Sequence, residues 1–386
     1  IHWTEHNIFG GKDIKRCWEL SRFFWGPLMA RASIISSDKK YIQTVNKWIK
    51  NWCESNPINA GPNWICGQEV AIRLIHIMQT WKLVENNNYP TLTSGKINFV
   101  VEHLTRISCT LDYALAQQNN HWISESAALF IGGNWLSREK NQHSSKAKTW
   151  CKIGLKNLEK SVNLLIMNDG SFAQHSTNYH RLVLDTLSQV ELWRRWLGLK
   201  PFSNNFYTKF KAATNWLNQF IDDKSGNVPN LGHNDGSFCY QLHCLSYRDF
   251  RPTLKIAQLL CPQKNGASLA QNEYFEPSIW LNLHKSKIEK IKNKNFEIFD
   301  SGGYVILRPN TNQWGMLRLP TYNFRPAHAD PLHFDLWNNG ENILRDGGTF
   351  SYNSRPTDMN YFKGIECHNS VQFDKKNPMV PLGNFL

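Results

Sequence analysis

The chain has 386 residues, 41% of them hydrophobic, and a formal net charge of +13 although only 19% of its residues are charged. This composition excludes a disordered chain, and no apolar run reaches the roughly 18 residues that a membrane-spanning helix needs. The positive charge favours an anionic partner, such as nucleic acid, a membrane surface or an acidic polysaccharide, with a merely basic surface as the alternative.

Tryptophan and cysteine are the other unusual features of the composition. The sixteen tryptophans are consistent with two uses, because indole rings grip sugar rings and also pack in helical cores. The nine cysteines include no Cys-x-x-Cys pair, so we expect free and mostly buried thiols. Free thiols mildly favour the cytoplasm. The chain begins at Ile1 without a signal-peptide pattern, so we expect either a removed leader or a missing N-terminal part.

Helical periodicity dominates the first 283 residues. Apolar residues recur at positions i, i+3, i+4 and i+7, and short turns separate the periodic segments. Long antiparallel helices with short connections predict an (α/α) toroid of helical hairpins over residues 1–283. The clearest segments are Val45–Trp52, Glu69–Leu83, Ile97–Ala116, Trp122–Leu136, Ala147–Met167, Asn178–Leu197 and Tyr207–Phe220.

The pattern changes to short strands near the C-terminus. Residues 284–297 are rich in lysine and are interpreted either as an exposed linker or as a solvated helix face. Residues 298–386 are expected to form an antiparallel β-sandwich, and a complete sandwich would continue past Leu386. The turn at residues 338–340 predicts a hairpin. The expected strands are Tyr304–Arg308, Trp314–Leu319, Leu332–Trp337, Asn342–Arg345 and Ser370–Phe373. The predicted fold class is therefore α+β with two domains.

Common catalytic signatures are missing from the sequence. It holds no Gly-x-Gly-x-x-Gly, P-loop, His-Glu-x-x-His or Gly-x-Ser-x-Gly motif, so we expect no nucleotide cofactor. It also lacks a basic stripe or a recognisable reader motif for nucleic acid, so we expect no nucleic-acid partner.

The first candidate site is the pair Asn120 and His121, just before a helix that we expect to begin near Trp122. Asn120 can serve there simply as the helix N-cap. Alternatively, the positive end of the helix and the two polar side chains can bind a carboxylate.

The second candidate site is the pair Tyr179 and His180, which opens another helix after the polar run Gln174–Asn178. Such a pair is often core packing, but the polar residues before it favour a solvent-facing cleft. A tyrosine becomes a usable base only where positive charge stabilises its phenolate.

A third candidate lies in the β-rich region, where His328, Asp346 and His368 occupy separate strands or turns. Two imidazoles and one carboxylate are a common set of zinc ligands that leaves a fourth position for water. Since the three residues are far apart in sequence, unrelated packing positions remain the alternative.

Together these motifs resemble the heparinase II/III-like polysaccharide lyase superfamily, which includes alginate lyases and dermatan-type uronate epimerases. The resemblance covers most of the chain and is similar in style to members found with bacterial surface-polysaccharide genes. It implies an (α/α) toroid followed by a β-sandwich and favours a periplasmic or cell-envelope location. The motifs are Asn119-Asn-His121, Asp169-Gly-Ser171 with Tyr179-His180, Ser301-Gly-Gly-Tyr304 with Arg308, and His328-Ala-Asp330 with Asp346-Gly-Gly-Thr349 and His368-Asn369.

The resemblance implies β-elimination on a uronic acid. Asn120 and His121 would neutralise the substrate carboxylate, which acidifies the proton at C5. Tyr179 would protonate the leaving oxygen at C4 and, for one sugar epimer, also act as the base. The metal ligands implied for a zinc or similar divalent ion are His328, Asp346 and His368.

One position departs from the pattern of the resemblance. Many members carry His-x-His-x-Asp, and the first of these histidines falls on Pro326 here. The side chains that could replace it are Arg325, His333, Tyr352 and Tyr361. The full set of candidate substrate-binding residues is Trp122, Gln174, His175, His180, Asn234, Arg325, His333 and Tyr361.

Three functions follow from these patterns. The first is a lyase acting on an acidic polysaccharide or oligosaccharide. The second is a uronate C5-epimerase, which removes the same proton but returns it without cleaving the chain. The third is a non-catalytic protein that binds an acidic glycan in surface-polysaccharide biosynthesis.

Overall fold

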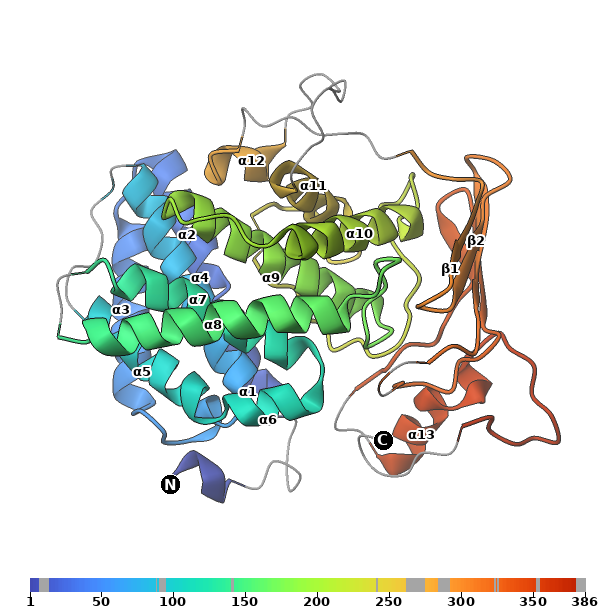
Figure 1. Ribbon diagram of the computed structural model, residues 1–386, viewed down its shortest axis with the longest axis horizontal. Coiled ribbons are helices and arrows are strands. Elements are labelled where there is room, and N and C mark those ends of the chain that lie inside the picture. The colour runs from blue at the N-terminus through green and yellow to red at the C-terminus, as the bar shows by residue number, and fades with distance from the viewer. Residues whose placement is uncertain are drawn as a thin grey trace.

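The protein is described here by a computed structural model with a helical domain beside a β domain (Figure 1). The described residues are 1–6, 14–87, 89, 95–139, 142–240, 242–261, 275–283, 292–322, 324, 326–351 and 355–379. None of the helices in these ranges is long and apolar enough to cross a membrane.

The helical domain contains, within the described ranges, α1 (Lys15–Ser21), α2 (Trp25–Ser36), α3 (Lys40–Ser55), α4 (Gly67–Asn86), α5 (Lys96–Cys109), α6 (Leu111–Gln117), α7 (Asn120–Leu136), α8 (Ser144–Leu165), α9 (Thr177–Trp196), α10 (Asn204–Phe220), α11 (Arg251–Leu260) and α12 (Glu276–Trp280). Short 3-10 helices cover Trp3–Glu5, Pro62–Trp64 and Ile365–Cys367.

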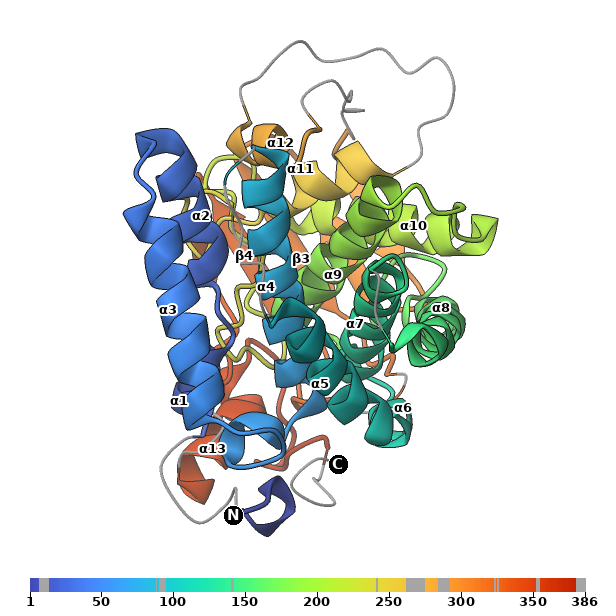
Figure 2. The same ribbon diagram turned by 90° about the vertical axis from the view of Figure 1, so that its left-hand side faces the viewer.

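The helices are arranged as an inner and an outer set. Helices α4, α7 and α9 bury residues on every face, whereas α3, α8 and α10 bury one side and expose the other. Figure 2 shows α4, α7 and α9 between α3 and α8, which lie on opposite flanks. A helix that is apolar all round needs neighbours on all sides, so the sequence pattern accounts for this layering.

Helices α7 and α8 pack closely together, and glycine permits the approach. A Cβ atom on Gly154 would lie 2.4 Å from the backbone nitrogen of Phe130, and one on Gly133 would lie 2.9 Å from that of Cys151. The two helices therefore pack backbone against backbone at these points. This contact fixes α7, whose N-terminus carries the first candidate pair.

The β domain holds a single five-stranded antiparallel sheet among the described residues, in the order β1-β2-β3-β4-β5. The strands are β1 (Phe296–Phe299), β2 (Tyr304–Leu307), β3 (Gln313–Arg318), β4 (Phe334–Asn338) and β5 (Glu341–Leu344), and helix α13 (Pro356–Lys363) follows. The predicted hairpin is confirmed: Asn338 pairs with Glu341, and Asn339 and Gly340 between them have positive φ angles of 52° and 91°. Two central positive φ angles are typical of a type I′ turn.

The predicted two-domain α+β fold is confirmed, with corrections in detail. The predicted helix over residues 97–116 is broken at Thr110, and the helix expected from Trp122 begins two residues earlier, at Asn120. The strand predicted at Ser370–Phe373 was wrong, because Val371 and Phe373 are exposed and form no strand pairing. Strand β1 lies partly within the predicted linker over residues 284–297, of which residues 284–291 lie outside the described ranges.

All nine cysteines are free, as expected, but the expectation that most are buried was wrong. Only Cys239 and Cys261 are buried, and Cys53, Cys109 and Cys244 are exposed. Half of the tryptophans are core residues, because the side chains of Trp64, Trp81, Trp122, Trp150, Trp193, Trp216, Trp314 and Trp337 are buried.

Candidate functional site

Helix α7 begins at the first candidate pair, and its capping differs from the expectation. The N-cap is Asn119, whose side-chain oxygen accepts the His121 backbone N–H at 2.9 Å. The Asn120 backbone N–H is taken by Gln174 Oε1 at 3.0 Å. Because Asn119 does the capping, the Asn120 side chain is left for other contacts. The first backbone donors of α7 are already satisfied, so a ligand would meet side chains there.

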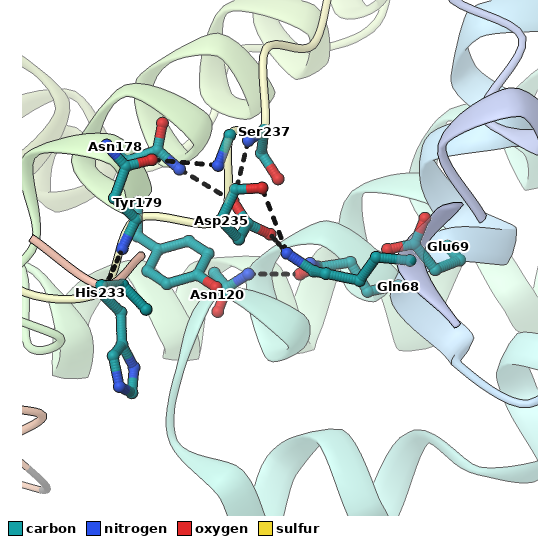
Figure 3. Close-up of polar contacts among 12 residues, drawn as sticks. Gln68, Glu69, Asn120, Asn178, Tyr179, His233, Asp235 and Ser237 are labelled. Carbon is teal, nitrogen blue, oxygen red and sulfur yellow. Dashed lines mark hydrogen bonds and ion pairs between the residues drawn. The ribbon is translucent and has the colours of Figure 1, made fainter. Parts of the chain in front are cut away.

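The Asn120 amide is buried and held by helix α4. Its Nδ2 donates to Gln68 Oε1 at 2.6 Å, as Figure 3 shows. In the same view the phenol ring of Tyr179 points toward Asn120. The amide and the phenol come from the N-terminal turns of α7 and α9, which pack against each other.

The His121 ring lies beside the carboxylate of Glu125 and the thiol of Cys66. Its Nδ1 is 3.8 Å from Glu125 Oε1, one helical turn away, and its ring also contacts the Cys66 sulfur. Burial disfavours the charged ring, but Cys66 and Glu125 outweigh it and raise the pKa of His121 to about 10. His121 is therefore a cation at neutral pH.

Tyr179 lies in the first turn of α9 and is anchored through its backbone. Ser176 caps this helix, accepting the Tyr179 N–H at 3.1 Å. The Ser176 hydroxyl in turn donates to the backbone oxygen of His233. The position of the phenol thus depends on the irregular segment that contains residue 233.

That segment, residues 229–237, is tied to the helical core by Asp235. The Asp235 carboxylate accepts bonds from Asn178 Nδ2 and the Ser237 N–H, both at 2.9 Å, as drawn in Figure 3. Its other oxygen pairs with Lys15 Nζ at 2.9 Å. Burial raises its pKa, but Lys15 and Arg22 outweigh burial and hold the pKa of Asp235 well below its usual range.

The three predicted metal ligands converge in the β domain. His328, Asp346 and His368 are buried, and each offers a ligand atom within 4.8 Å of the other two. His368 Nδ1 bonds the Gly364 carbonyl oxygen at 2.7 Å, which leaves its Nε2 for Asp346 Oδ2 at 3.3 Å.

Neither ring nitrogen of the buried His328 has a hydrogen-bond partner among the described residues. A buried polar group without a partner is costly, and a cation bound by all three side chains would remove that cost. The second hydrogen bond of His368 is also typical of a metal-binding imidazole. The residues therefore fit a divalent metal ion.

Four residues were suggested to replace the family histidine that falls on Pro326, and the structure describes two of them, His333 and Tyr361. Pro326 is half-buried and offers no N–H. His333 is fully buried, with its Nε2 3.5 Å from Asp335 Oδ2, so it faces no cleft. Tyr361 is 53% exposed on α13, whereas Arg325 and Tyr352 lie outside the described residues.

Another imidazole, His233, lies against the metal-ligand cluster from the helical side. Its ring centroid is 5.5 Å from that of His328, at an interplanar angle of 78°. Burial and the neighbouring His328 lower the pKa of His233 well below its ordinary value. The helical domain and the metal-ligand cluster therefore meet at this residue.

Two predicted substrate-binding residues occupy packing positions. The buried Trp122 indole donates to Asn157 Oδ1 at 3.3 Å, which turns it toward helix α8. His180 Nε2 bonds the Ala213 carbonyl oxygen at 2.9 Å, its ring stacks on Trp216, and burial lowers its pKa to about 4. These placements do not support contact with a substrate.

Two other predicted substrate-binding residues, His175 and Asn234, make contacts between the two domains, and Gln174 lies beside Asn120. Gln174 accepts from Asn120, and the buried His175 bonds the hydroxyl of Tyr304 in strand β2 at 3.2 Å. The Asn234 N–H donates to Thr349 Oγ1 at 2.9 Å, and its Oδ1 accepts from Tyr247 at 2.6 Å.

A polar hollow of about 380 Å³ opens at the junction of the two domains. Asn120, His121 and Tyr179 are not among the residues that line it. It is lined by Lys15, Arg16, Glu19, Asn230, Asn234, Asp235, Gly236, Tyr247 and Arg248 of the helical domain and by Gly347, Thr349, Phe350 and Ser351 of the β domain.

Several residues of the site were missed by the sequence analysis. Asp235 was not predicted, although its neighbour Asn234 was, and its buried carboxylate anchors the segment. Gln68, Cys66 and Glu125 occupy helical positions with ordinary periodicity, so their spacing gave no signal. The crossing of α4 over the start of α7 brings Cys66 and Gln68 to the site, whereas Glu125 lies one turn after His121 on α7 itself.

Comparison with known proteins places these observations in a family. Residues 1–236 match the heparinase II/III N-terminus, and residues 291–386 match the heparinase II/III-like C-terminal region. A heparin-sulfate lyase of Bacteroides thetaiotaomicron is 25% identical over 400 residues, which cover 95% of this chain and 53% of that protein. A heparin-sulfate lyase of Bacteroides stercoris is 22% identical over 401 residues, with 95% and 55% covered. The chain spans about half the length of these curated relatives.

Solved structures show the same fold. A crystal structure of heparinase III matches with a TM-score of 0.62 and 20% identity, over 93% of this chain and 55% of that one. A heparan sulfate lyase from Pedobacter heparinus matches with a TM-score of 0.55 and 19% identity, over 98% and 56%. Since the two sequence matches cover the helical domain up to residue 236 and the whole sheet, this chain belongs to the heparinase II/III-like family.

Proposed function

We propose that this chain carries the catalytic site of a polysaccharide lyase that cleaves a uronic-acid-containing glycan by β-elimination. The observation that supports this most is that the Tyr179 phenol, in the first turn of α9, points toward the Asn120 amide at the start of α7, where His121 is the next residue. Relatives named heparin-sulfate lyases support an acidic glycan as the substrate. The net charge of +13 agrees with a polyanionic partner.

In this proposal Asn120 and His121 bind the substrate carboxylate. Removal of the C5 proton places negative charge on that carboxylate, and groups that already point at the charge lower the barrier. The Asn120 amide is fixed by Gln68, and His121 is a cation at neutral pH. The positive end of the α7 dipole adds to the same effect.

Tyr179 is proposed as the acid that protonates the leaving oxygen at C4. For one sugar epimer Tyr179 would first remove the C5 proton as the phenolate base and then pass that proton to the C4 oxygen as the C4–O bond breaks. Its phenol points toward Asn120 in Figure 3, so the two groups can act on neighbouring atoms of one sugar ring.

We further propose that His328, Asp346 and His368 bind zinc. A four-coordinate ion suits two imidazoles, one carboxylate and a water molecule. A bound ion would supply positive charge near the junction of the domains and would link the three segments that carry its ligands. The proton transfers themselves are assigned to side chains of the helical domain.

The proposal is tested by incubating the protein with a panel of uronic-acid polysaccharides and recording the ultraviolet absorbance of an unsaturated product. The panel includes heparan sulfate, because the relatives are named for it. The Tyr179→Phe variant keeps the ring and removes the acid, so its product formation should disappear while glycan binding remains.

Other outcomes separate the alternatives. Deuterium uptake at C5 from heavy water, without chain cleavage, would identify a C5-epimerase. Glycan binding with neither uptake nor cleavage, unchanged in Tyr179→Phe, would identify a non-catalytic binding protein. Absence of an unsaturated product on every glycan, with well-folded protein, refutes the lyase.

A further inference from the structure

A buried carboxylate stands behind the proposed anion-binding pair. The Glu125 side chain is 3% exposed, and its Oε1 lies 3.8 Å from Nδ1 of His121. The His121 side chain is 23% exposed, so it is the member of this pair that solvent and ligands can reach. Glu125 therefore contacts the imidazole from the protein side only.

The start of helix α4 packs directly against the Glu125 carboxylate. A Cβ atom on Gly67 would lie 2.5 Å from Glu125 Oε2, so only glycine lets the start of α4 approach the carboxylate this closely. Cys66, the N-cap of the same helix, contacts the His121 ring. The carboxylate thus lies against the first turn of α4.

The other charged groups around the pair can be named element by element. Helix α5 contributes Arg106, whose positive charge acts on both Glu125 and Cys66. Helix α7 contributes Glu125, and the residue before α4 contributes the Cys66 thiol. Burial raises the pKa of Glu125 above its ordinary value, and His121 and Arg106 offset only part of this rise.

An ordinary helix-surface pair would not need this arrangement. Exposed pairs of opposite charge at positions i and i+4 contribute little to stability and are solvated on all sides. A carboxylate buried as deeply as Glu125 is costly unless a cation accompanies it. Its burial is therefore explained by a partner that stays charged.

We infer that Glu125 is a positioning residue that holds His121 as an imidazolium facing the substrate, so that the site selects glycans presenting a carboxylate. This inference rests on the proposed function of His121. Glu125 itself touches no substrate and acts through the ring in front of it. The Cys66 contact limits the rotation of that ring on its other side.

The test follows the protonation of His121 directly by NMR of the imidazole resonances, assigned with a His121→Gln variant. In the native chain the ring should stay protonated through neutral pH. In Glu125→Gln, which keeps the shape and removes the charge, the titration should fall by roughly one to three pH units, as expected when an adjacent opposite charge is lost. Glu54→Gln, at an exposed i,i+4 pair with Lys50 on α3, is the matched control and should leave His121 unchanged.

A second variant covers the case in which Glu125→Gln does not fold. Gly67→Ala displaces the carboxylate by adding a methyl group against it, and His121 should again titrate lower. An unchanged His121 titration in whichever of these variants folds, or a neutral ring at pH 7 in the native chain, overturns the inference.

Activity gives an independent measurement. In Glu125→Gln the KM for a uronate glycan should rise more than kcat falls, and the alkaline limit of activity should move to lower pH. If no glycan is cleaved by the native chain, the proposed function fails while the NMR titration still decides the role of Glu125. If cleavage persists but its pH profile is the same in Glu125→Gln, the positioning role fails alone.

Discussion

Replacement of Asp235 by asparagine removes one charge from the anchor of segment 229–237. In the native chain Asp235 Oδ2 lies 2.9 Å from Lys15 Nζ, and the two side chains are 4% and 16% exposed, respectively. The amide of Asp235→Asn keeps one oxygen for Asn178 and Ser237. It leaves the mostly buried Lys15 facing a neutral group at the wall of the polar hollow.

The expected loss of stability is about 3 kcal/mol, because removing one partner of a buried ion pair costs roughly 3–5 kcal/mol. The lower end applies, since one acceptor oxygen remains and Lys15 retains some exposure. Asp38→Asn is the matched control. Asp38 pairs with Lys40 at a similar 2.8 Å, but these side chains are 37% and 67% exposed, so no measurable change is expected.

The assay is urea unfolding followed by tryptophan fluorescence. At pH 7 the free energy of unfolding should fall by about 3 kcal/mol in Asp235→Asn and stay unchanged in Asp38→Asn. The folded-state pKa of Asp235 is depressed, so its contribution is present above its unfolded pKa of about 3.9 and is lost as the pH falls. The gap between native chain and variant should therefore narrow below about pH 4. Equal losses in the two variants, or a loss under about 1 kcal/mol for Asp235, would refute the reasoning.

Three further predictions concern other parts of the structure. His368→Ala should abolish stoichiometric zinc binding, measured by metal analysis after dialysis, and unchanged zinc content would contradict the metal site. Gly154→Ala should destabilise the fold by about 1–3 kcal/mol, because the added methyl group meets the Phe130 backbone. Lys156→Ala, on the exposed face of α8, is the control. Equal unfolding free energies for the two variants would count against the close contact. The stabilisation by protonated His121 should be complete below about pH 6.5 and disappear as the pH rises to about 10. The difference in unfolding free energy between the native chain and His121→Gln should therefore shrink over that range. A difference that stays constant with pH would disprove this prediction.

The sequence predicted those parts of the fold that follow from local patterns. Helical periodicity located the helices of the inner and outer sets, and the turn at Asn339 and Gly340 located the β4–β5 hairpin, because both signals are carried by neighbouring residues. The break at Thr110 was missed, since apolar spacing continues across it. The false strand at Ser370–Phe373 shows the opposite error: its composition suits a strand, but no neighbouring strand pairs with it.

The candidate site was predictable only where the residue type itself suggests chemistry. His328, Asp346 and His368 were expected to converge, and they do. Gln68 could not be found this way, because it reaches Asn120 only through the crossing of α4 and α7. Glu125 lies one turn after His121 on α7, but only the structure shows that its carboxylate is buried. His180 was predicted to bind substrate because it follows Tyr179 directly, but its side chain points into the core.

The metal-ligand cluster and the proton-transfer residues are linked through segment 229–237. Ser176, which caps the helix of Tyr179, bonds this segment from the helical side. On the β side, Thr349 Oγ1 accepts the Asn234 N–H. Thr349 lies three residues after Asp346, and the Asp346 carboxylate accepts the backbone N–H of Gly348 between them. An ion bound by Asp346 would therefore hold Thr349 and segment 229–237 in place, and this segment contacts the start of α9, where Tyr179 lies. In the proposed mechanism, His328, Asp346 and His368 therefore position the site, and the proton transfers are assigned to side chains of α7 and α9.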